Sequence, residues 1–229
     1  MSDEPQTCWD LVAGAANGDG DARRAFGELY LPIVETYIEQ RWRGNGLLQD
    51  KDDAVQEVFV ECFRDGGALE KVEQGKGSGF RGFLFGTTRN VAMRFERKAG
   101  SKLAENPAHT GFLDQIANDE DRLSRVFDRE WARAIVRQAG DLQSRRAEAR
   151  GGNALQRLEV LRRRFDDGMS VPDIAAELGE SPELIHKWYA RGRADFRECL
   201  RDVVSRHLRE PIDPDGVEEE CRRLLALLD

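Results

Sequence analysis

Apolar residues recur at helical spacing along nearly the whole chain of 229 residues. Steps that alternate between three and four residues place successive members on one face of an α-helix. The faces comprise Phe26, Tyr30, Ile33 and Tyr37; Val55, Phe59 and Cys62; Leu84, Thr88, Val91 and Phe95; Leu123, Phe127, Trp131 and Ala134; Leu158, Leu161 and Phe165; and Val217, Cys221, Leu224 and Leu228. No stretch shows the alternation of apolar and polar residues that marks a β-strand. The sequence therefore predicts an all-α fold.

Two polar stretches interrupt this pattern. Residues 65–79 contain five glycines and are predicted to form a loop. Residues 104–121 carry five acidic side chains and no Lys or Arg, which indicates an inter-domain linker. Residues 140–153 are predicted to be a polar loop or a weak helix. The resulting division is a helical domain at 1–103, the acidic linker at 104–121, a second helical domain at 122–209 and an acidic amphipathic tail at 210–229.

Composition limits the class of protein. Hydrophobic residues make up 40% of the chain and charged residues 34%, with a net charge of −8, which is typical of globular proteins. No apolar run approaches the roughly 20 residues that span a bilayer, and the N-terminal residues MSDEPQTCWD do not resemble a secretory signal. The four cysteines are far apart without a CxxC pair, so we expect no metal site and a cytoplasmic location.

The clearest local signal lies in residues 171–194, VPDIAAELGESPELIHKWYARGRA. It predicts a short helix, a turn at Gly179 that tolerates positive φ, and a second helix capped by Ser181. This is the order of a helix-turn-helix, whose second helix enters the major groove of DNA. The outward side chains of that helix would be His186, Lys187, Ala190 and Arg191, followed by the basic flank of Arg193 and Arg197. The alternative is a pair of packed helices with a solvated basic face.

A second segment, residues 80–98 (FRGFLFGTTRNVAMRFERK), combines aromatic and basic side chains on one predicted helix. Beside its apolar face, another stripe runs through Phe83, Thr87, Asn90, Arg94 and Arg97, and Lys98 extends it. Aromatic and guanidinium groups on one helix suit unstacked bases and a phosphate backbone. The alternative is a core helix with a basic solvent face.

A third segment, residues 50–65 (DKDDAVQEVFVECFRD), predicts a helix that buries Val55, Val58, Phe59 and Cys62. Its outer side would be lined by Asp53, Gln56, Glu57 and Arg64. By itself, a polar helix face of this kind indicates only contact with solvent.

In this order, the three segments resemble the sigma-70 family of bacterial transcription initiation factors, and within it the small two-domain extracytoplasmic function (ECF) group. DDAVQEVFVECFR is similar to the region-two helix that docks on the clamp of the RNA polymerase β′ subunit. FRGFLFGTTRNVAMRFERK is similar to the helix that melts and reads the −10 promoter element. SVPDIAAELGESPELIHKWYARGRADF is similar to region four, which reads the −35 element. FDREWARAI and the tail EEECRRLLALL resemble a subgroup common in planctomycete-like bacteria.

The resemblance implies roles for individual residues. The β′ clamp would be met by Asp53, Gln56, Glu57 and Arg64. The −10 helix would be anchored by Phe80 and Phe83, and the 65–79 loop would capture a flipped base. Contacts to the melted strand and its upstream duplex would come from Asn90, Arg94, Arg97 and Lys98. The −35 element would be met by Ser181 near a phosphate, by His186, Lys187 and Arg191 at base edges, and by Arg193.

The function implied by the resemblance is promoter-specific initiation of transcription. The partners would be core RNA polymerase, through its β′ clamp and β flap, promoter DNA, and an anti-sigma factor or another regulator. The chain would perform no covalent chemistry and need no cofactor. Residues 86–88 read GTT where the family usually has a more apolar run, so this helix is expected to be less rigid. His186–Lys187–Trp188 is also unusual, so the preferred −35 sequence is open.

Three other functions stay open. A stand-alone helix-turn-helix regulator would bind palindromic DNA without polymerase, but the aromatic and basic helix at 80–98 would then have no obvious purpose. A sigma-like interaction module would bind partners without initiating transcription. An enzyme is not expected, because the three histidines are scattered and no phosphate-binding glycine loop or metal-ligand spacing is visible.

Overall fold

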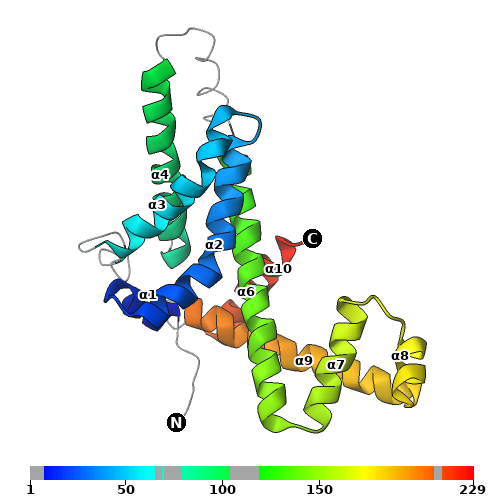
Figure 1. The fold of residues 1–229 in the computed structure, drawn as a ribbon. Coiled ribbons are helices and arrows are strands. Elements are labelled where there is room, and N and C mark those ends of the chain that lie inside the picture. Colours follow the sequence, from blue (N-terminus) through cyan, green and yellow to red (C-terminus); the bar gives the residue numbers. More distant parts are fainter. Residues whose placement is uncertain (1–7, 65–68, 70–78, 104–118, 209–212) are drawn as a thin grey trace. The chain divides into compact units, whose positions relative to one another are not determined.

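Helices account for most of the chain in the computed structural model, which describes residues 8–64, 69, 79–103, 119–208 and 213–229 (Figure 1). They are α1 (Cys8–Ala16), α2 (Gly20–Trp42), the 3-10 helix η1 (Gly46–Asp50), α3 (Lys51–Phe63), α4 (Gly79–Leu103), α6 (Glu120–Arg150), α7 (Asn153–Phe165), α8 (Val171–Leu178), α9 (Pro182–His207) and α10 (Pro214–Ala226). No strand occurs among these described residues, so the all-α prediction is confirmed.

The chain divides into two compact units. Unit 1 consists of Met1–Ala134, Arg206–Asp213 and Arg222–Asp229, and unit 2 of Ile135–Ser205 and Pro214–Cys221. The division falls inside α6, whereas the sequence placed a linker at 104–121. Most of that segment, and most of the predicted loop at 65–79, lies outside the described residues. Glu120 and Asp121, the last two residues of the predicted linker, belong to the first turn of α6.

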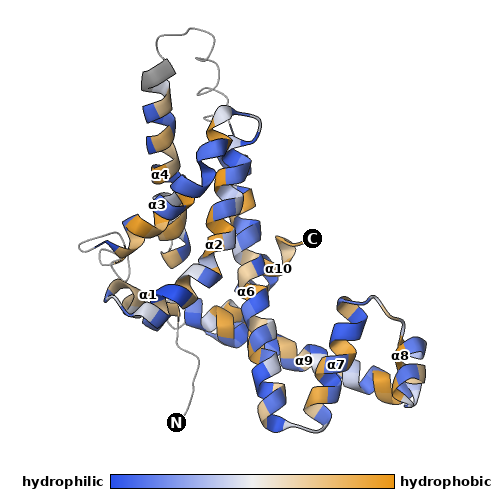
Figure 2. Ribbon diagram, viewed as in Figure 1, coloured by the Kyte–Doolittle hydropathy of each residue, from blue (hydrophilic) through white to orange (hydrophobic). Residues whose placement is uncertain are grey.

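The core of unit 1 is built from aromatic side chains of several helices. Phe26 and Tyr30 of α2 are buried, and the Tyr30 ring stacks on Trp131 of α6 with centroids 5.7 Å apart. Phe80, in the first turn of α4, meets Phe26 edge-on at 5.8 Å. Aromatic pairs of this geometry stabilise a core beyond the area that they bury. Figure 2 shows the corresponding apolar and polar sides of the individual helices.

A buried ion pair joins α2 to α4 within this unit. The Arg41 guanidinium donates through Nε to Glu96 Oε1 at 2.6 Å and through Nη2 to Glu96 Oε2 at 3.1 Å, and both residues are only 5% exposed. Trp42 Nε1 donates to the same carboxylate at 2.9 Å. The Glu96 carboxylate thus accepts three hydrogen bonds and faces the charge of Arg41, so both buried charges are compensated.

Of the two alternatives predicted for residues 140–153, a polar loop or a weak helix, the structure shows a helix over most of the segment. Helix α6 continues without interruption to Arg150, and the chain turns only at Gly151 and Gly152, both with positive φ. The polar segment is held as a helix by contacts to α9. Gln143 donates to the Gly192 carbonyl at 2.9 Å, and Arg146 pairs with Asp202 at 2.5 Å.

Helix α9 approaches α7 closely at Gly192, which is buried. A Cβ atom at this position would lie 2.8 Å from the Arg157 carbonyl oxygen and 3.6 Å from Leu161 Cβ. Such a short distance to a backbone atom leaves no room for a side chain. Glycine at 192 therefore sets how near the two helices can come.

The predicted amphipathic tail helix is present as α10. Val217, Cys221 and Leu224 are buried, as the helical spacing predicted, while Leu228 is half-buried. Arg201 of α9 and Glu218 of α10 form an ion pair at 3.6 Å. Helix α10 therefore has a buried apolar side.

Candidate nucleic-acid interface

The helix-turn-helix predicted at 171–194 is formed by α8 and α9. Ser170 caps α8 by accepting a hydrogen bond from the Asp173 N–H at 3.3 Å, and Gly179 ends it in the left-handed conformation at φ 66°. Ser181 Oγ then accepts from the Leu184 N–H at 3.3 Å at the start of α9. The turn at Gly179 and the cap at Ser181 were predicted from the sequence, and both have the expected geometry; the cap at Ser170 was not predicted.

The two helices are held together by a small apolar core within unit 2. Ile174 and Ala175 of α8 pack with Ile185 and Trp188 of α9 and with Val160 of α7. This core turns the opposite side of α9 outward. His186, Lys187, Ala190 and Arg191 are all exposed, as predicted.

The residues predicted to meet the −35 element do not all share one side of α9. Lys187 and Arg191 are four residues apart and therefore neighbours on the helix. Arg193 is instead four residues beyond Tyr189, and its guanidinium lies 5.6 Å from the centre of the Tyr189 ring. Arg191 and Arg193, two residues apart, point in different directions. The predicted set thus divides into two groups.

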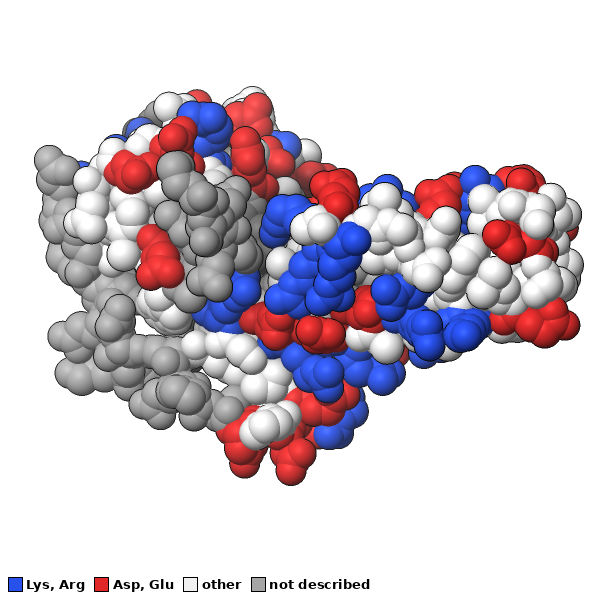
Figure 3. Space-filling view, turned by 90° about the horizontal axis from the view of Figure 1, so that it is seen from below, with Lys and Arg blue, Asp and Glu red and all other residues white. Residues whose placement is uncertain are grey.

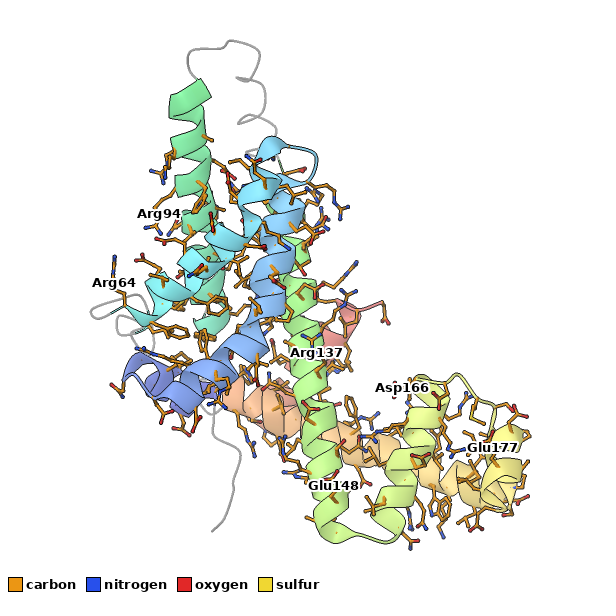
Figure 4. The ribbon with its side chains drawn as sticks, viewed as in Figure 1. Arg64, Arg94, Arg137, Glu148, Asp166 and Glu177 are labelled. Carbon is orange, nitrogen blue, oxygen red and sulfur yellow. The ribbon has the colours of Figure 1, made fainter. Side chains whose placement is uncertain are left out.

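The outer side of α3 has the exposure that the sequence predicted. Asp53, Gln56 and Arg64 are exposed, and Glu57 is half-buried. Arg64, labelled at the end of α3 in Figure 4, pairs with Glu61 at 3.1 Å. The carboxylate of Asp53 has no ion pair within the part of the chain that the structure describes. It is free to meet a basic partner.

The predicted site residues of α4 differ in how exposed they are. Asn90, Arg94, Arg97 and Lys98 are exposed, whereas Phe83 is half-buried. Phe80 is 2% exposed and packs among core aromatic rings, so it anchors the helix and offers no ring face to a base. Thr87, expected on the mixed stripe, is buried as well.

Arg94 links the two predicted surfaces of unit 1. Its Nη2 lies 3.1 Å from Glu57 Oε1, and its Nη1 lies 3.5 Å from Glu61 Oε2. Figure 4 shows Arg94 on the side of α4 that faces α3. The sequence assigned Glu57 to a protein contact and Arg94 to DNA, and the structure brings them together. Exposed ion pairs of this kind contribute about 0–1 kcal/mol, so they exchange easily for other partners.

Acidic and basic side chains lie close together on the face that Figure 3 shows. In the space-filling view of Figure 3, groups of Lys and Arg lie among groups of Asp and Glu. A mixed surface of this kind does not attract nucleic acid in bulk. Any nucleic-acid contact therefore depends on small local groups of cations.

Several ionisable groups are shifted by their surroundings. Partial burial acts to raise the pKa of Glu120, but hydrogen bonds from Arg89 at 2.9 Å and Arg41 at 3.0 Å outweigh it and lower the pKa below its usual value. Burial raises the pKa of Cys8 and of Cys62 to about 12. Both thiols are therefore protonated at neutral pH and unsuited to nucleophilic chemistry.

The structure reveals two features that the sequence analysis missed. One is the Arg41–Glu96 pair, whose members are 55 residues apart in the chain. The other is a group of aromatic and basic side chains at the end of α7, where Arg164 joins Arg193 on the Tyr189 ring. The run Arg162–Arg163–Arg164 was a visible signal for the second feature.

Comparison with known proteins gives no family: no family model matches the chain, and no curated protein matches it. Among the described residues, no group of three or more metal-ligating side chains is placed to hold an ion. No described helix is both long and apolar enough to cross a membrane.

Proposed function

We propose that this chain is a sigma factor of the ECF type, which binds core RNA polymerase, recognises −10 and −35 promoter elements and promotes initiation of transcription. The helix-turn-helix of unit 2 carries the proposal, because its turn, its caps and the exposed cations of α9 agree with a DNA-reading module. The order of the three sequence segments supports the more specific assignment to sigma factors.

In this proposal α9 lies in the major groove of the −35 element. Lys187 and Arg191, which share one side of the helix, would reach base edges, and so would the exposed His186. An arginine fork matches the O6 and N7 atoms of guanine, and such a pair discriminates against a wrong base by about 1–3 kcal/mol. Ser181 and Arg193 would contact the phosphate backbone, which fixes the orientation of the helix but reads no sequence.

Unit 1 would meet the polymerase and the −10 element through adjacent helices. The exposed side of α3, with Asp53, Gln56, Glu57 and Arg64, would face the β′ clamp. Asn90, Arg94, Arg97 and Lys98 of α4 would contact the melted strand, with Phe83 at the edge of the same surface. Phe80 supports this surface from the core.

The chemistry of such a protein is differential binding. Holding single-stranded −10 DNA more tightly than duplex DNA favours melting without any covalent step. Two modest DNA contacts on one chain combine when the polymerase fixes their spacing, because the second contact then becomes intramolecular. The chain would need no cofactor of its own, since the Mg²⁺ used in RNA synthesis belongs to the polymerase, and it would act in the cytoplasm.

A transcription assay tests the proposal directly. The purified chain is mixed with core polymerase and fragmented genomic DNA, and the 5′ ends of the RNA are sequenced. We expect chain-dependent start sites that share two upstream elements. If the chain instead binds palindromic duplexes on its own and leaves the start sites unchanged, it is a stand-alone regulator and the proposal is wrong.

Matched variants assign the two surfaces in the same assay. Asp53→Lys should weaken binding to core polymerase, whereas Asp52→Lys, one residue away and on a different side of α3, should not.

Arg191→Ala should change the preference at one base position of the −35 element. Arg145→Ala, an exposed arginine of α6 in the same unit, is the control. Equal effects of Arg191→Ala on all promoters would make Arg191 a phosphate contact.

A further inference from the structure

Two guanidinium groups from different helices meet at one tyrosine ring in unit 2. Arg164, in the last turn of α7, lies 5.8 Å from the centre of the Tyr189 ring, and Arg193 of α9 lies 5.6 Å from it. Phe165, whose ring centroid is 6.3 Å from that of Tyr189, is 67% exposed. Figure 4 labels Asp166, the residue that follows Phe165 in the chain. We call these four residues, Arg164, Phe165, Tyr189 and Arg193, the tyrosine cluster.

The two arginines of the tyrosine cluster differ from two neighbouring arginines, Arg157 and Arg163, in their partners. Arg157 pairs with Asp195 at 3.1 Å, and Arg163 pairs with Glu159 at 2.7 Å. Neither Arg164 nor Arg193 has a carboxylate partner in the part of the chain that the structure describes. Arg164 donates instead to the Met169 carbonyl. A carbonyl oxygen and an aromatic ring orient a guanidinium group but do not cancel its charge.

An oriented, uncancelled pair of guanidinium groups is suited to an anion from outside the chain. Arginine forks bind phosphate through two parallel N–H···O bonds, and orienting them in advance lowers the entropy cost of binding. The cluster lies beside the helix-turn-helix, on a different side of α9 from Lys187 and Arg191. In complexes of such motifs, contacts to the DNA backbone flank the contacts to base edges. Duplex DNA is therefore the partner that the position favours.

We infer that Arg164 contacts the phosphate backbone of the DNA bound by α9, and that Tyr189 is a positioning residue that holds Arg164 and Arg193 toward it. This inference rests on the DNA-binding part of the proposed function. It extends the interface beyond the two helices of the helix-turn-helix to the end of α7.

The test measures binding of the full chain to a duplex of random sequence by fluorescence anisotropy over a series of salt concentrations. Removing one cation that neutralises a phosphate should lower the slope of log affinity against log salt by about 0.9. We expect this decrease for Arg164→Gln. Arg162→Gln is the matched control, because Arg162 is exposed, carries the same charge and donates only to Ser144 Oγ among the described residues. An unchanged slope for Arg164→Gln, or equal decreases in both variants, would overturn the inference.

Two substitutions of Tyr189 test the positioning role. Tyr189→Phe keeps an aromatic face and should keep the affinity, whereas Tyr189→Leu keeps apolar packing without that face and should weaken binding by about fivefold. Equal affinities of the two variants would show that the ring only packs. Thermal unfolding of both variants identifies any decrease in affinity that comes from stability.

A third variant separates DNA from a protein partner. Phe165→Ala should leave DNA binding unchanged, because the inference assigns no contact to its ring. If Phe165→Ala weakens DNA binding as much as Arg164→Gln, the cluster acts as an apolar docking surface and the inference is wrong. The transcription assay with Arg191→Ala tests the proposed function without using the salt dependence of DNA binding. Failure of this inference is therefore distinguishable from failure of the proposed function.

Discussion

Replacing Gly192 by alanine tests the packing of unit 2 at its tightest point. Two opposing effects decide the result. Alanine in place of glycine inside a helix is favourable by about 1 kcal/mol. The added Cβ, however, would lie 2.8 Å from the Arg157 carbonyl oxygen, so α7 and α9 must move apart. Overpacking of this kind costs about 1–3 kcal/mol. We therefore expect Gly192→Ala to lower the free energy of unfolding of unit 2 by up to about 2 kcal/mol.

Gly140→Ala is the matched control. Gly140 lies inside α6 in the same unit, and a Cβ there would have open space around it. The control should therefore show only the favourable helix effect. The contribution of helix propensity cancels between the two variants, which leaves a difference of about 1–3 kcal/mol from the steric conflict alone.

Native-state hydrogen exchange followed by mass spectrometry measures this difference locally. It reports the opening free energy of each segment, so peptides from unit 1 serve as an internal reference. Peptides from α7 and α9 should exchange about tenfold faster in Gly192→Ala for each 1.4 kcal/mol of destabilisation. If Gly192→Ala protects these peptides as well as Gly140→Ala does, the close approach of the two helices is not as described.

Three further predictions concern unit 1. Arg41→Met should lower the free energy of unfolding by about 3–5 kcal/mol, measured by denaturant titration, because it leaves the buried Glu96 carboxylate without a cation; a decrease below about 1 kcal/mol would contradict the burial of the pair. Because the pKa of Glu120 is lower in the folded chain than its unfolded value near 4.5, the ionised carboxylate stabilises the fold at pH values above about 4.5. This stabilisation is lost as the pH falls through the pKa of the folded state. Glu120→Gln should therefore make stability fall less steeply in acid, and an identical acid limb would argue against the Arg41 and Arg89 contacts. Cys62 should resist alkylation at pH 8 until the chain unfolds, because its pKa is raised to about 12 by burial; rapid labelling of the native protein, followed by mass spectrometry, would show that the thiol is accessible.

Local signals explain why the helix-turn-helix could be predicted. The cap at Ser181 and the left-handed turn at Gly179 involve residues only a few positions apart, so they can be predicted from the sequence alone. The apolar faces of α2 and α10 were equally visible, because helical spacing is a local property. Exposure of Lys187 and Arg191 then followed from the burial of the opposite side.

Long-range contacts explain what the sequence could not predict. Residues 140–153 look polar and weakly helical, yet Gln143 reaches the Gly192 carbonyl and Arg146 reaches Asp202, partners that are 49 and 56 residues away in the sequence. The placement of Phe80 in the core likewise depends on partners from three other helices. The division of the predicted −35 residues into two groups became visible only with the stacking of Arg193 on Tyr189.

The Arg41–Glu96 pair has a consequence for how this chain can change over evolutionary time. Loss of Arg41 alone would leave the buried Glu96 charge without a cation and remove about 3–5 kcal/mol, which is a large share of the roughly 5–15 kcal/mol that keeps a typical domain folded. Loss of Glu96 alone costs less, because Arg41 still pairs with Glu120. Replacement of both partners by well-packed apolar residues need not destabilise the fold. Substitution of Arg41 is therefore tolerated only where Glu96 has changed as well. Among descendants of a common ancestor, those that lack Arg41 should also lack Glu96.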